Sequence, residues 1–237
     1  MHPVLFNIGP LRVYSYGAFV ALAFAVFALL TERRARAMNI DSGRMLDLAI
    51  LILVSGIVGS RIMYVTLNMS YYAANPAELI DLSKGGLVWY GGAFAAFLAG
   101  SIYVKINRMD LWNILDLIAP YLALGQSLGR IGCFFNGCCY ASDGAPVQLY
   151  SSAILLVIFV ILRIWQDARK FKGEIFLGYC MLYPVKRFAI EFLRADNPRI
   201  LAGLTISQVI SVFVFVIAFA IFFKRRAIWK ETSTDLR

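Results

Sequence analysis

The longest stretches of this sequence are apolar and almost uncharged, and they are long enough to cross a lipid bilayer as helices. Seven such segments can be distinguished, at residues 13–30, 46–67, 87–106, 111–128, 149–164, 175–193 and 204–223. Hydrophobic residues make up 60% of the chain and charged residues 16%, whereas soluble domains have about 45–50% and about 25%. The sequence therefore predicts an all-α polytopic membrane protein with seven transmembrane helices, forming a single integral membrane domain over residues 1–237.

The basic residues are unevenly distributed between the loops, and this predicts the orientation in the membrane. If all seven segments span, the basic clusters at 33–36, 169–172 and 224–226 fall on one side. Because positive loops favour the cytoplasm, we expect the N-terminus outside and the C-terminus inside. The first segment is not expected to be a cleaved signal peptide, since its positive residues follow the apolar run. The net charge of +9 suits anionic lipid headgroups, so we expect no nucleic-acid partner.

Several ionisable residues lie within or beside the apolar segments, where such residues are costly and usually functional. They are Arg61, Asp116, Arg130, Arg187, Glu191 and Arg194. Arg187 and Glu191 are four residues apart and can form an ion pair on one helix face, and Asp116 can pair with an intramembrane arginine. The arginines outnumber the acids, and a phosphate group, which arginine binds in bidentate fashion, would balance the excess.

Two glycine-containing segments stand near these charges. GGLVWYGG occupies residues 85–92, and GRIGCFFNGCCY occupies residues 129–140. Glycine lets the backbone approach a neighbouring helix or a ligand closely. Close helix packing explains the first segment equally well, whereas Arg130 and Asn136 accompany the glycines of the second and favour a binding site there.

These segments together resemble the prolipoprotein diacylglyceryl transferase family over nearly the whole chain. The matching pieces, in order, are HPVLFNIGP (2–10), YG (16–17), GSRIMYV (59–65), GGLVWYGG (85–92), LDLIAP (115–120), GRIGCFFNGCCY (129–140), QLY (148–150), YPVKRFAIEFLR (183–194) and SQ (207–208). GRIGCFFNGCCY corresponds to the family signature GRxGNFxNxExxG. Each piece alone is weak, but their order and spacing together are specific.

The resemblance implies a multi-pass enzyme of the bacterial cell inner membrane. Such an enzyme transfers the diacylglyceryl group of phosphatidylglycerol to the lipobox cysteine of a prelipoprotein and releases glycerol phosphate. The expected partners are therefore phosphatidylglycerol, the prelipoprotein signal peptide with its lipobox cysteine, and membrane lipid. The resemblance implies no cofactor and no metal.

The resemblance also implies roles for individual residues. Arg130 and Arg187 would hold the lipid phosphate, and Glu191 would orient Arg187. Substrate-binding roles are expected for Tyr16, Asn136, Tyr183, Arg61, Asp116 and Arg194. These roles fit the chemistry, because a thiolate displaces a phosphate ester and fixed cations stabilise the charge that builds on the leaving oxygens.

Four positions depart from the family pattern. The family usually has histidine at Tyr90, asparagine at Cys133, glutamate at Cys138 and glycine at Ala141. His2 is the only histidine of the chain, so a histidine base is missing from the segment around Tyr90. Tyr90 is therefore the catalytic candidate at this position. Tyrosine has an ordinary pKa near 10 and is a poor base unless adjacent arginines lower that pKa, so Tyr90 acts either as the base or, as we expect, as a hydrogen-bond donor to substrate.

The thiols of the second glycine-containing segment leave several interpretations open. Cys133, Cys138 and Cys139 can form a disulfide, remain as buried thiols, bind a metal or act as redox groups. Cys180 is expected to be a packing residue. The alternative functions are transfer from the same phospholipid to a different acceptor, a membrane thiol oxidoreductase, and a transporter or lipid-binding protein without chemistry.

Overall fold

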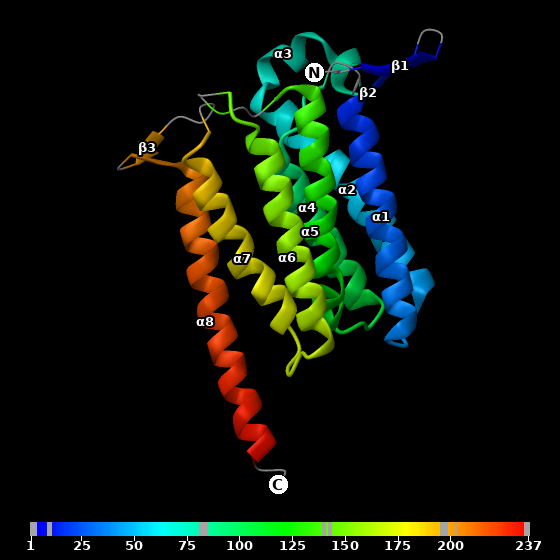
Figure 1. Ribbon diagram of the computed structural model, residues 1–237. Coiled ribbons are helices and arrows are strands. Elements are labelled where there is room, and N and C mark those ends of the chain that lie inside the picture. The colour runs from blue at the N-terminus through cyan, green and yellow to red at the C-terminus, as the bar shows by residue number, and fades with distance from the viewer. Residues whose placement is uncertain are drawn as a thin grey trace. The chain divides into compact units, whose positions relative to one another are not determined.

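The computed structural model describes residues 4–8, 11–80, 85–138, 141, 144–194, 199–201 and 203–234, and helices dominate it (Figure 1). Its long helices are α1 (Ser15–Ala37), α2 (Ser42–Leu67), α4 (Trp89–Ile106), α5 (Leu111–Asn136), α6 (Val147–Asp167), α7 (Glu174–Glu191) and α8 (Ile206–Thr234). The shorter elements are α3 (Met69–Ala74), the 3-10 helix η1 (Pro76–Leu79), the antiparallel pair β1 (Val4–Ile8) and β2 (Leu11–Tyr14), and the antiparallel pair β3 (Arg199–Leu201) and β4 (Leu204–Thr205).

Each long helix overlaps one predicted apolar segment. Four of them, at Ser15–Ala37, Ser42–Leu67, Val147–Asp167 and Ile206–Thr232, are long and apolar enough to cross a membrane. The apolar part of α4, Tyr90–Ile106, falls short of the same length. The helical class and the polytopic membrane character are therefore confirmed, while the number of seven spans and the orientation stay predictions.

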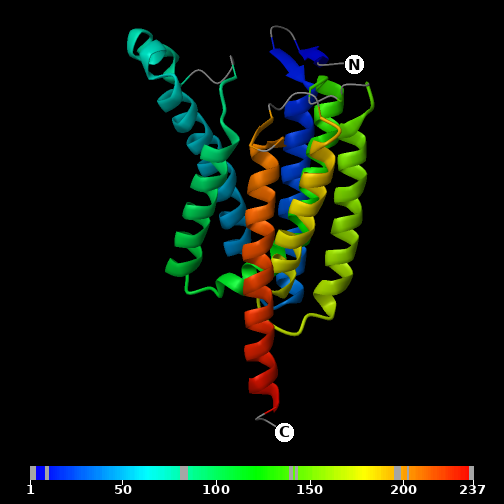
Figure 2. The same cartoon turned by 90° about the vertical axis from the view of Figure 1, so that its left-hand side faces the viewer.

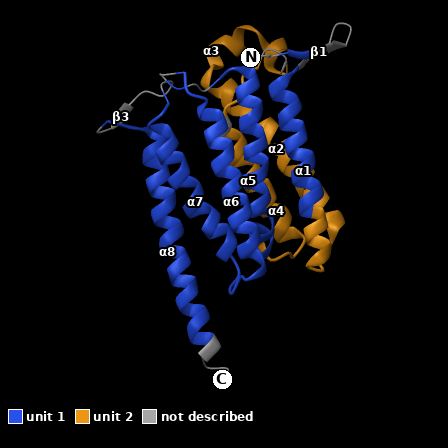
Figure 3. Cartoon of the chain, in the orientation of Figure 1, with its two compact units in different colours: residues 1–31, 112–237 blue, residues 32–111 orange. Residues whose placement is uncertain are grey.

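The chain divides into two compact units (Figure 3). Unit 1 comprises Met1–Thr31 and Trp112–Arg237, and unit 2 comprises Glu32–Leu111. Within unit 1, α7 packs between α6 and α8, and the C-terminal part of α8 continues past the loop between α6 and α7 (Figures 1 and 2). The single domain over residues 1–237 stays a prediction.

Polar side chains join α5 to α6 inside unit 1. Pro120 has no N–H, so the carbonyl of Asp116, four residues earlier, lacks its helical donor. Gln166 Nε2 supplies that donor at 2.7 Å. Further along the same helix pair, Ser127 and Ser152 donate reciprocally to each other's carbonyl oxygens, both at 2.9 Å. These bonds satisfy polar groups where lipid offers no partner, so they fix the pairing of the two helices.

Asp116 determines how the chain turns from α6 into α7. Its side chain is fully buried and accepts the backbone N–H groups of Gly173 at 2.7 Å and of Ile175 and Phe176 at 2.9 Å. Arg169 pairs with the same carboxylate at 3.2 Å. Asp116 was expected to pair with an intramembrane arginine, but its partner Arg169 lies in the loop after α6, so only the pairing with an arginine as such is confirmed. The carboxylate also caps the N-terminus of α7, where negative charge is favoured.

Close helix contact is the main feature of unit 2. A methyl group on Gly59 of α2 would clash with Ala95 and would lie 2.6 Å from the carbonyl oxygen of Gly91, both on α4. Glycine at both positions therefore allows the two backbones to touch. The interpretation of Gly91 as a residue for close helix packing is confirmed.

The cap of α7 gives the first prediction. Asp116→Ala leaves three backbone N–H groups and Arg169 without their buried acceptor, so we expect a loss of about 3 kcal/mol in the free energy of unfolding. For a chain of this size that corresponds to a fall in Tm of about 6–12 °C, measured on detergent-purified protein. The matched control is Asp167→Ala, which removes an exposed pair with Arg163; equal falls in Tm would contradict the assignment.

Candidate functional site

A buried ion pair lies at the C-terminal end of α7. Arg187 Nη1 is 3.2 Å from Glu191 Oε2, one helical turn away on the same face. The Glu191 side chain is fully buried, and the Arg187 side chain is 17% exposed. Arg187 Nη2 also donates to Ser207 Oγ on α8 at 2.9 Å. The ion pair predicted from the spacing of the two residues is confirmed, and Ser207 of α8 binds a second nitrogen of the same guanidinium.

The start of α8 is locked by a capping box that also binds Glu191. Thr205 and Gln208 have the T-x-x-Q spacing of this motif. The Thr205 N–H donates to Gln208 Oε1 at 2.9 Å, and the Gln208 N–H donates to Thr205 Oγ1 at 3.3 Å. The Thr205 hydroxyl in turn donates to Glu191 Oε1 at 2.9 Å. The cap therefore fixes the carboxylate, and the carboxylate fixes the guanidinium of Arg187.

Three more cations gather around Arg187. Lys186 precedes it on α7 and is only 4% exposed, with its ammonium 5.4 Å from the centre of the Tyr183 ring. Arg130, near the end of α5, and Arg194, just after α7, act electrostatically on both Lys186 and Arg187. We call Arg130, Lys186, Arg187 and Arg194 the cationic cluster.

Counted over the described residues, the cationic cluster has more positive than negative charge. Glu191 is the one carboxylate, within the described part of the chain, that pairs with Arg187. Arg130 adds a guanidinium with five N–H donors, which can serve a ligand as well as the protein. Buried cations are costly without a counter-charge, and an anion such as phosphate would supply it.

Three other predicted residues lie on the helices that carry the cluster or next to them. Tyr183 is close enough to Arg187 to interact with its charge and packs against Tyr179, with ring centres 5.6 Å apart. Tyr16 is the second residue of α1 and lies beside α5, where a methyl group on Gly132 would come within 3.6 Å of the Tyr16 Cα. Asn136 is exposed at the last residue of α5, six residues after Arg130.

The loop after α5 returns to the end of α7. Gly137 has φ +74°, a conformation that favours glycine, and it ends the helix by donating to the carbonyl of Cys133 at 3.0 Å. Further along, Ala141 forms a β-bridge with Arg194, and Gln148 Nε2 donates to the carbonyl of Cys138 at 2.6 Å. The described part of the segment GRIGCFFNGCCY, residues 129–138, therefore contains Arg130 of the cationic cluster, and Ala141 after it contacts Arg194.

The structure decides some of the interpretations that the sequence left open for the cysteines. Cys133 and Cys138 are not joined by a disulfide to each other, while Cys139 lies outside the described residues, so the pairing of the three thiols stays open. No group of three or more His, Cys, Asp or Glu side chains in the described segments is placed to hold a metal ion. Cys180 packs against Leu177, Ala218 and Phe222, which confirms its interpretation as a packing residue.

Three further predicted site residues lie outside the cluster of unit 1 or belong to the other unit. Asp116 lies fourteen residues before Arg130 on α5, about 21 Å along a helix axis, where it caps α7. Arg61 and Tyr90 belong to unit 2. Tyr90 is 51% exposed at the start of α4.

Arg61 holds backbone together in unit 2. Its guanidinium donates to the carbonyl oxygens of Glu78 at 2.7 Å, Leu79 at 2.9 Å and Gly85 at 2.9 Å. The rings of Tyr64 and Tyr72 lie 5.8 and 5.2 Å from its centre. The structure thus gives Arg61 a structural task, anchoring the segment that precedes α4; its substrate-binding role stays a prediction.

The sequence reasoning missed Lys186 and Thr205. Lys186 lies inside the apolar run YPVKRFAIEF, which was a signal that it is buried. Thr205 and Gln208 carried a capping-box spacing directly before an apolar helix, which is a readable signal.

Together the fold and the site define a polytopic membrane protein with a largely buried cationic site suited to an anionic group. The family model for prolipoprotein diacylglyceryl transferase matches residues 3–224, so the chain belongs to this family. It is 32% identical to a phosphatidylglycerol–prolipoprotein diacylglyceryl transferase of Clostridium tetani over 94% of this chain and 97% of that protein. A protein of the same name from Bacillus licheniformis is 30% identical over 95% of this chain and 93% of its own length.

The link between the cap and the cluster gives the second prediction. Thr205→Val removes the hydroxyl that caps α8 and donates to Glu191, so we expect a loss of about 1–2 kcal/mol in the free energy of unfolding. Thr232→Val is the matched control, because the Thr232 hydroxyl only donates to a carbonyl within the exposed end of α8. Chemical denaturation in detergent measures both, and equal stability of Thr205→Val and the parent protein would contradict the assignment.

Proposed function

We propose that this protein transfers the diacylglyceryl group of phosphatidylglycerol to the lipobox cysteine thiol of a prelipoprotein and releases glycerol phosphate. The observation that supports this most is the buried cationic cluster, with its excess of positive charge, in a chain of the diacylglyceryl transferase family. The proposal needs a site for a lipid phosphate, and the cluster has the charge and donors for one.

The charge balance of the reaction explains why such a cluster would speed it. The thiolate sulfur forms a bond to the glyceryl carbon, and the bond from that carbon to the phosphate oxygen breaks. The phosphate carries one negative charge as a diester and about two as the departing monoester. Cations fixed around it therefore stabilise the leaving group more than the bound lipid, which is the condition for catalysis.

Individual residues take the following parts in the proposal. Arg130 and Arg187 bind the phosphate, Glu191 orients Arg187, and Lys186 and Arg194 add positive charge. Tyr16, Tyr183 and Asn136 contribute polar groups beside the cluster. The side chains of Asp116 and Arg61 bind backbone groups of the protein, so the proposal depends little on their binding substrate as well.

The proposal includes a location and an orientation. The protein is a multi-pass protein of the bacterial inner membrane with seven spans, its N-terminus outside and its C-terminus in the cytoplasm. The basic residues of the loop at 169–172 and of the end of α8 support this orientation by the positive-inside rule. The cationic cluster, at the opposite end of α7, would then meet phosphatidylglycerol and the signal peptide in the outer half of the bilayer.

The two arginines give the third prediction. We expect Arg130→Ala and Arg187→Ala each to lower kcat at least about 10²-fold, because each removes fixed donors at the leaving phosphate. Arg187→Lys should also be impaired, since lysine keeps the charge but loses the planar fork that binds Glu191 and phosphate together. Transfer of label from phosphatidylglycerol to a lipobox peptide measures all three.

Arg163→Ala is the control for these variants, because it removes an arginine from an exposed pair with Asp167 on α6. Its activity should equal that of the parent protein. Normal turnover by a folded Arg130→Ala or Arg187→Ala protein would remove the cluster from the mechanism.

Tyr90 gives the fourth prediction, for its proposed part as a hydrogen-bond donor to substrate. Tyr90→Phe should lower kcat/KM about 10-fold, as expected for one lost hydrogen bond, with an unchanged pH profile. If Tyr90 were instead the base that deprotonates the thiol, Tyr90→Phe would also lose a limb of the pH–rate profile. The measurement is kcat/KM against pH for both proteins.

The identity of the acceptor is tested with two peptides. A lipobox peptide should receive the labelled diacylglyceryl group, and the same peptide with Cys→Ser should not. Release of glycerol phosphate without labelling of the cysteine peptide would keep the phospholipid donor and point to another acceptor.

A further inference from the structure

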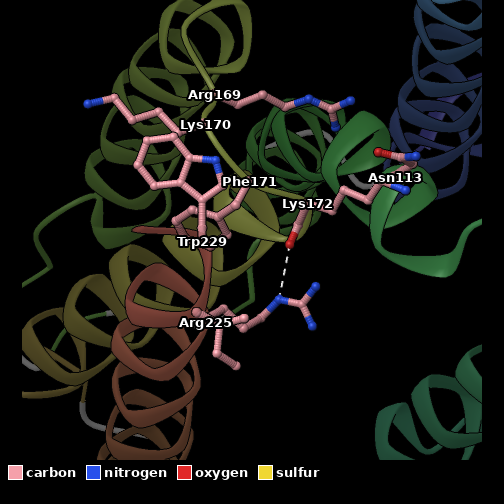
Figure 4. Close-up of a pocket in the computed structure, with 8 residues that line it drawn as sticks. Asn113, Arg169, Lys170, Phe171, Lys172, Arg225 and Trp229 are labelled. Carbon is pink, nitrogen blue, oxygen red and sulfur yellow. Dashed lines mark hydrogen bonds between the residues drawn. The ribbon is translucent and has the colours of Figure 1, made fainter. Parts of the chain in front are cut away.

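A second cationic site lies in unit 1, at the other end of α7 from the cationic cluster. It is a cavity of about 560 Å³ (Figure 4). Its lining comes from Asn113 on α5, from the loop residues Arg169, Lys170, Phe171 and Lys172, and from Arg225, Ile228 and Trp229 on α8. Asn113 is seventeen residues before Arg130, about 26 Å along the axis of α5, so this cavity is separate from the proposed catalytic site.

Two of the lining arginines are held in place by the protein. Arg225 Nε donates to the carbonyl oxygen of Lys172 at 3.1 Å (Figure 4), and the centre of its guanidinium lies 4.3 Å from that of the Trp112 ring. Arg169 is held by the buried carboxylate of Asp116 at 3.2 Å. A guanidinium fixed in this way loses little entropy when it binds an anion through its remaining N–H groups.

The acids near this cavity are already engaged elsewhere. Asp116 accepts three backbone N–H groups of the α7 start, and Glu174 accepts those of Lys170 and Phe171 together with Trp165 Nε1. Of the residues that the structure places around the cavity, none is acidic. The lining residues therefore include four cations, Arg169, Lys170, Lys172 and Arg225, of which Arg169 pairs with Asp116, and this excess of cations suits a ligand with negative charge.

An aromatic cavity adjoins the cationic one. It has a volume of about 310 Å³ and shares Lys170, Phe171 and Trp229 with its neighbour. Its lining also includes Trp165, Ala168 and Phe222, the cation Arg226, and Glu174, whose carboxylate already accepts the N–H groups of Lys170 and Phe171 and that of Trp165. Tryptophan together with basic residues is typical of the level where lipid headgroups meet acyl chains. The two cavities together offer cations to a phosphate and an apolar wall to the part of the molecule attached to it.

We propose that these adjoining cavities bind the phosphate of an anionic phospholipid whose glycerol and first acyl carbons lie against the aromatic side. This lipid is not the reacting one. With the C-terminus in the cytoplasm it belongs to the inner leaflet, where basic pockets between helices bind such headgroups. Its binding links the loop at 169–172 to α8 and stabilises the N-terminal end of α7, which is the end opposite the cationic cluster.

The test uses full-length Arg187→Ala protein, in which the proposed catalytic site is already impaired, so failure of the proposed function would not affect the result. Dioctanoyl phosphatidylglycerol, dioctanoyl phosphatidylserine and dioctanoyl phosphatidylcholine are titrated in a neutral detergent. Both anionic lipids should bind at least about 10-fold more tightly than the zwitterionic one. Adding Arg225→Gln should weaken their binding at least about 10-fold, as for one lost charge-assisted hydrogen bond.

Lys224→Gln is the matched control, because Lys224 is the exposed neighbour of Arg225 and does not line either cavity. It should change binding less than about 3-fold. Lys170→Gln gives a second test, since Lys170 lines both cavities, and Tm without lipid reports folding of each variant. Equal effects of Arg225→Gln and Lys224→Gln, or inorganic phosphate binding as tightly as the anionic lipids, would overturn the proposal.

Discussion

The buried pair of Arg187 and Glu191 is the interaction on which the proposed site depends. A charged pair inside a membrane protein is tolerated only when its remaining donors and acceptors are satisfied. The Thr205 hydroxyl donates to Oε1 of Glu191, and Nη2 of Arg187 donates to the Ser207 hydroxyl oxygen. Thr205 and Ser207 belong to the cap and the first turn of α8. The same hydrogen bonds therefore fix the packing of α7 against α8 and the orientation of the Arg187 guanidinium.

A buried carboxylate binds each end of helix α7, one from α5 and one from α7 itself. Asp116 caps its first turn, and Glu191 closes its last. Each buried carboxylate fixes one arginine, Arg169 at one end and Arg187 at the other, while further cations gather nearby. The two ends therefore have similar designs but different proposed tasks, one for the lipid that reacts and one for a lipid that braces the fold.

The long apolar runs were sufficient to locate each long helix that the structure describes, because membrane helices must satisfy their backbone internally and expose apolar side chains. Helix ends were less predictable: α1 continues to Ala37 and α8 to Thr234, beyond the apolar runs, since helices extend into water where charged residues also favour them. Arg187 and Glu191 were predictable as a pair because they are local. The partners of Asp116 and Arg61 were not, since Arg169 is 53 residues from Asp116 and Arg61 binds backbone carbonyls, which no side-chain pattern marks.

The central claim, that the cationic cluster holds the departing phosphate, is tested most directly by binding of the released product. Dissociation constants for glycerol phosphate can be measured by ³¹P NMR on the purified parent protein and on the Arg130→Ala, Arg187→Ala and Arg225→Gln variants. We expect the two cluster variants to bind at least about 10-fold more weakly than the parent, and Arg225→Gln to bind as the parent does. Equal binding by the parent and the cluster variants would contradict the claim.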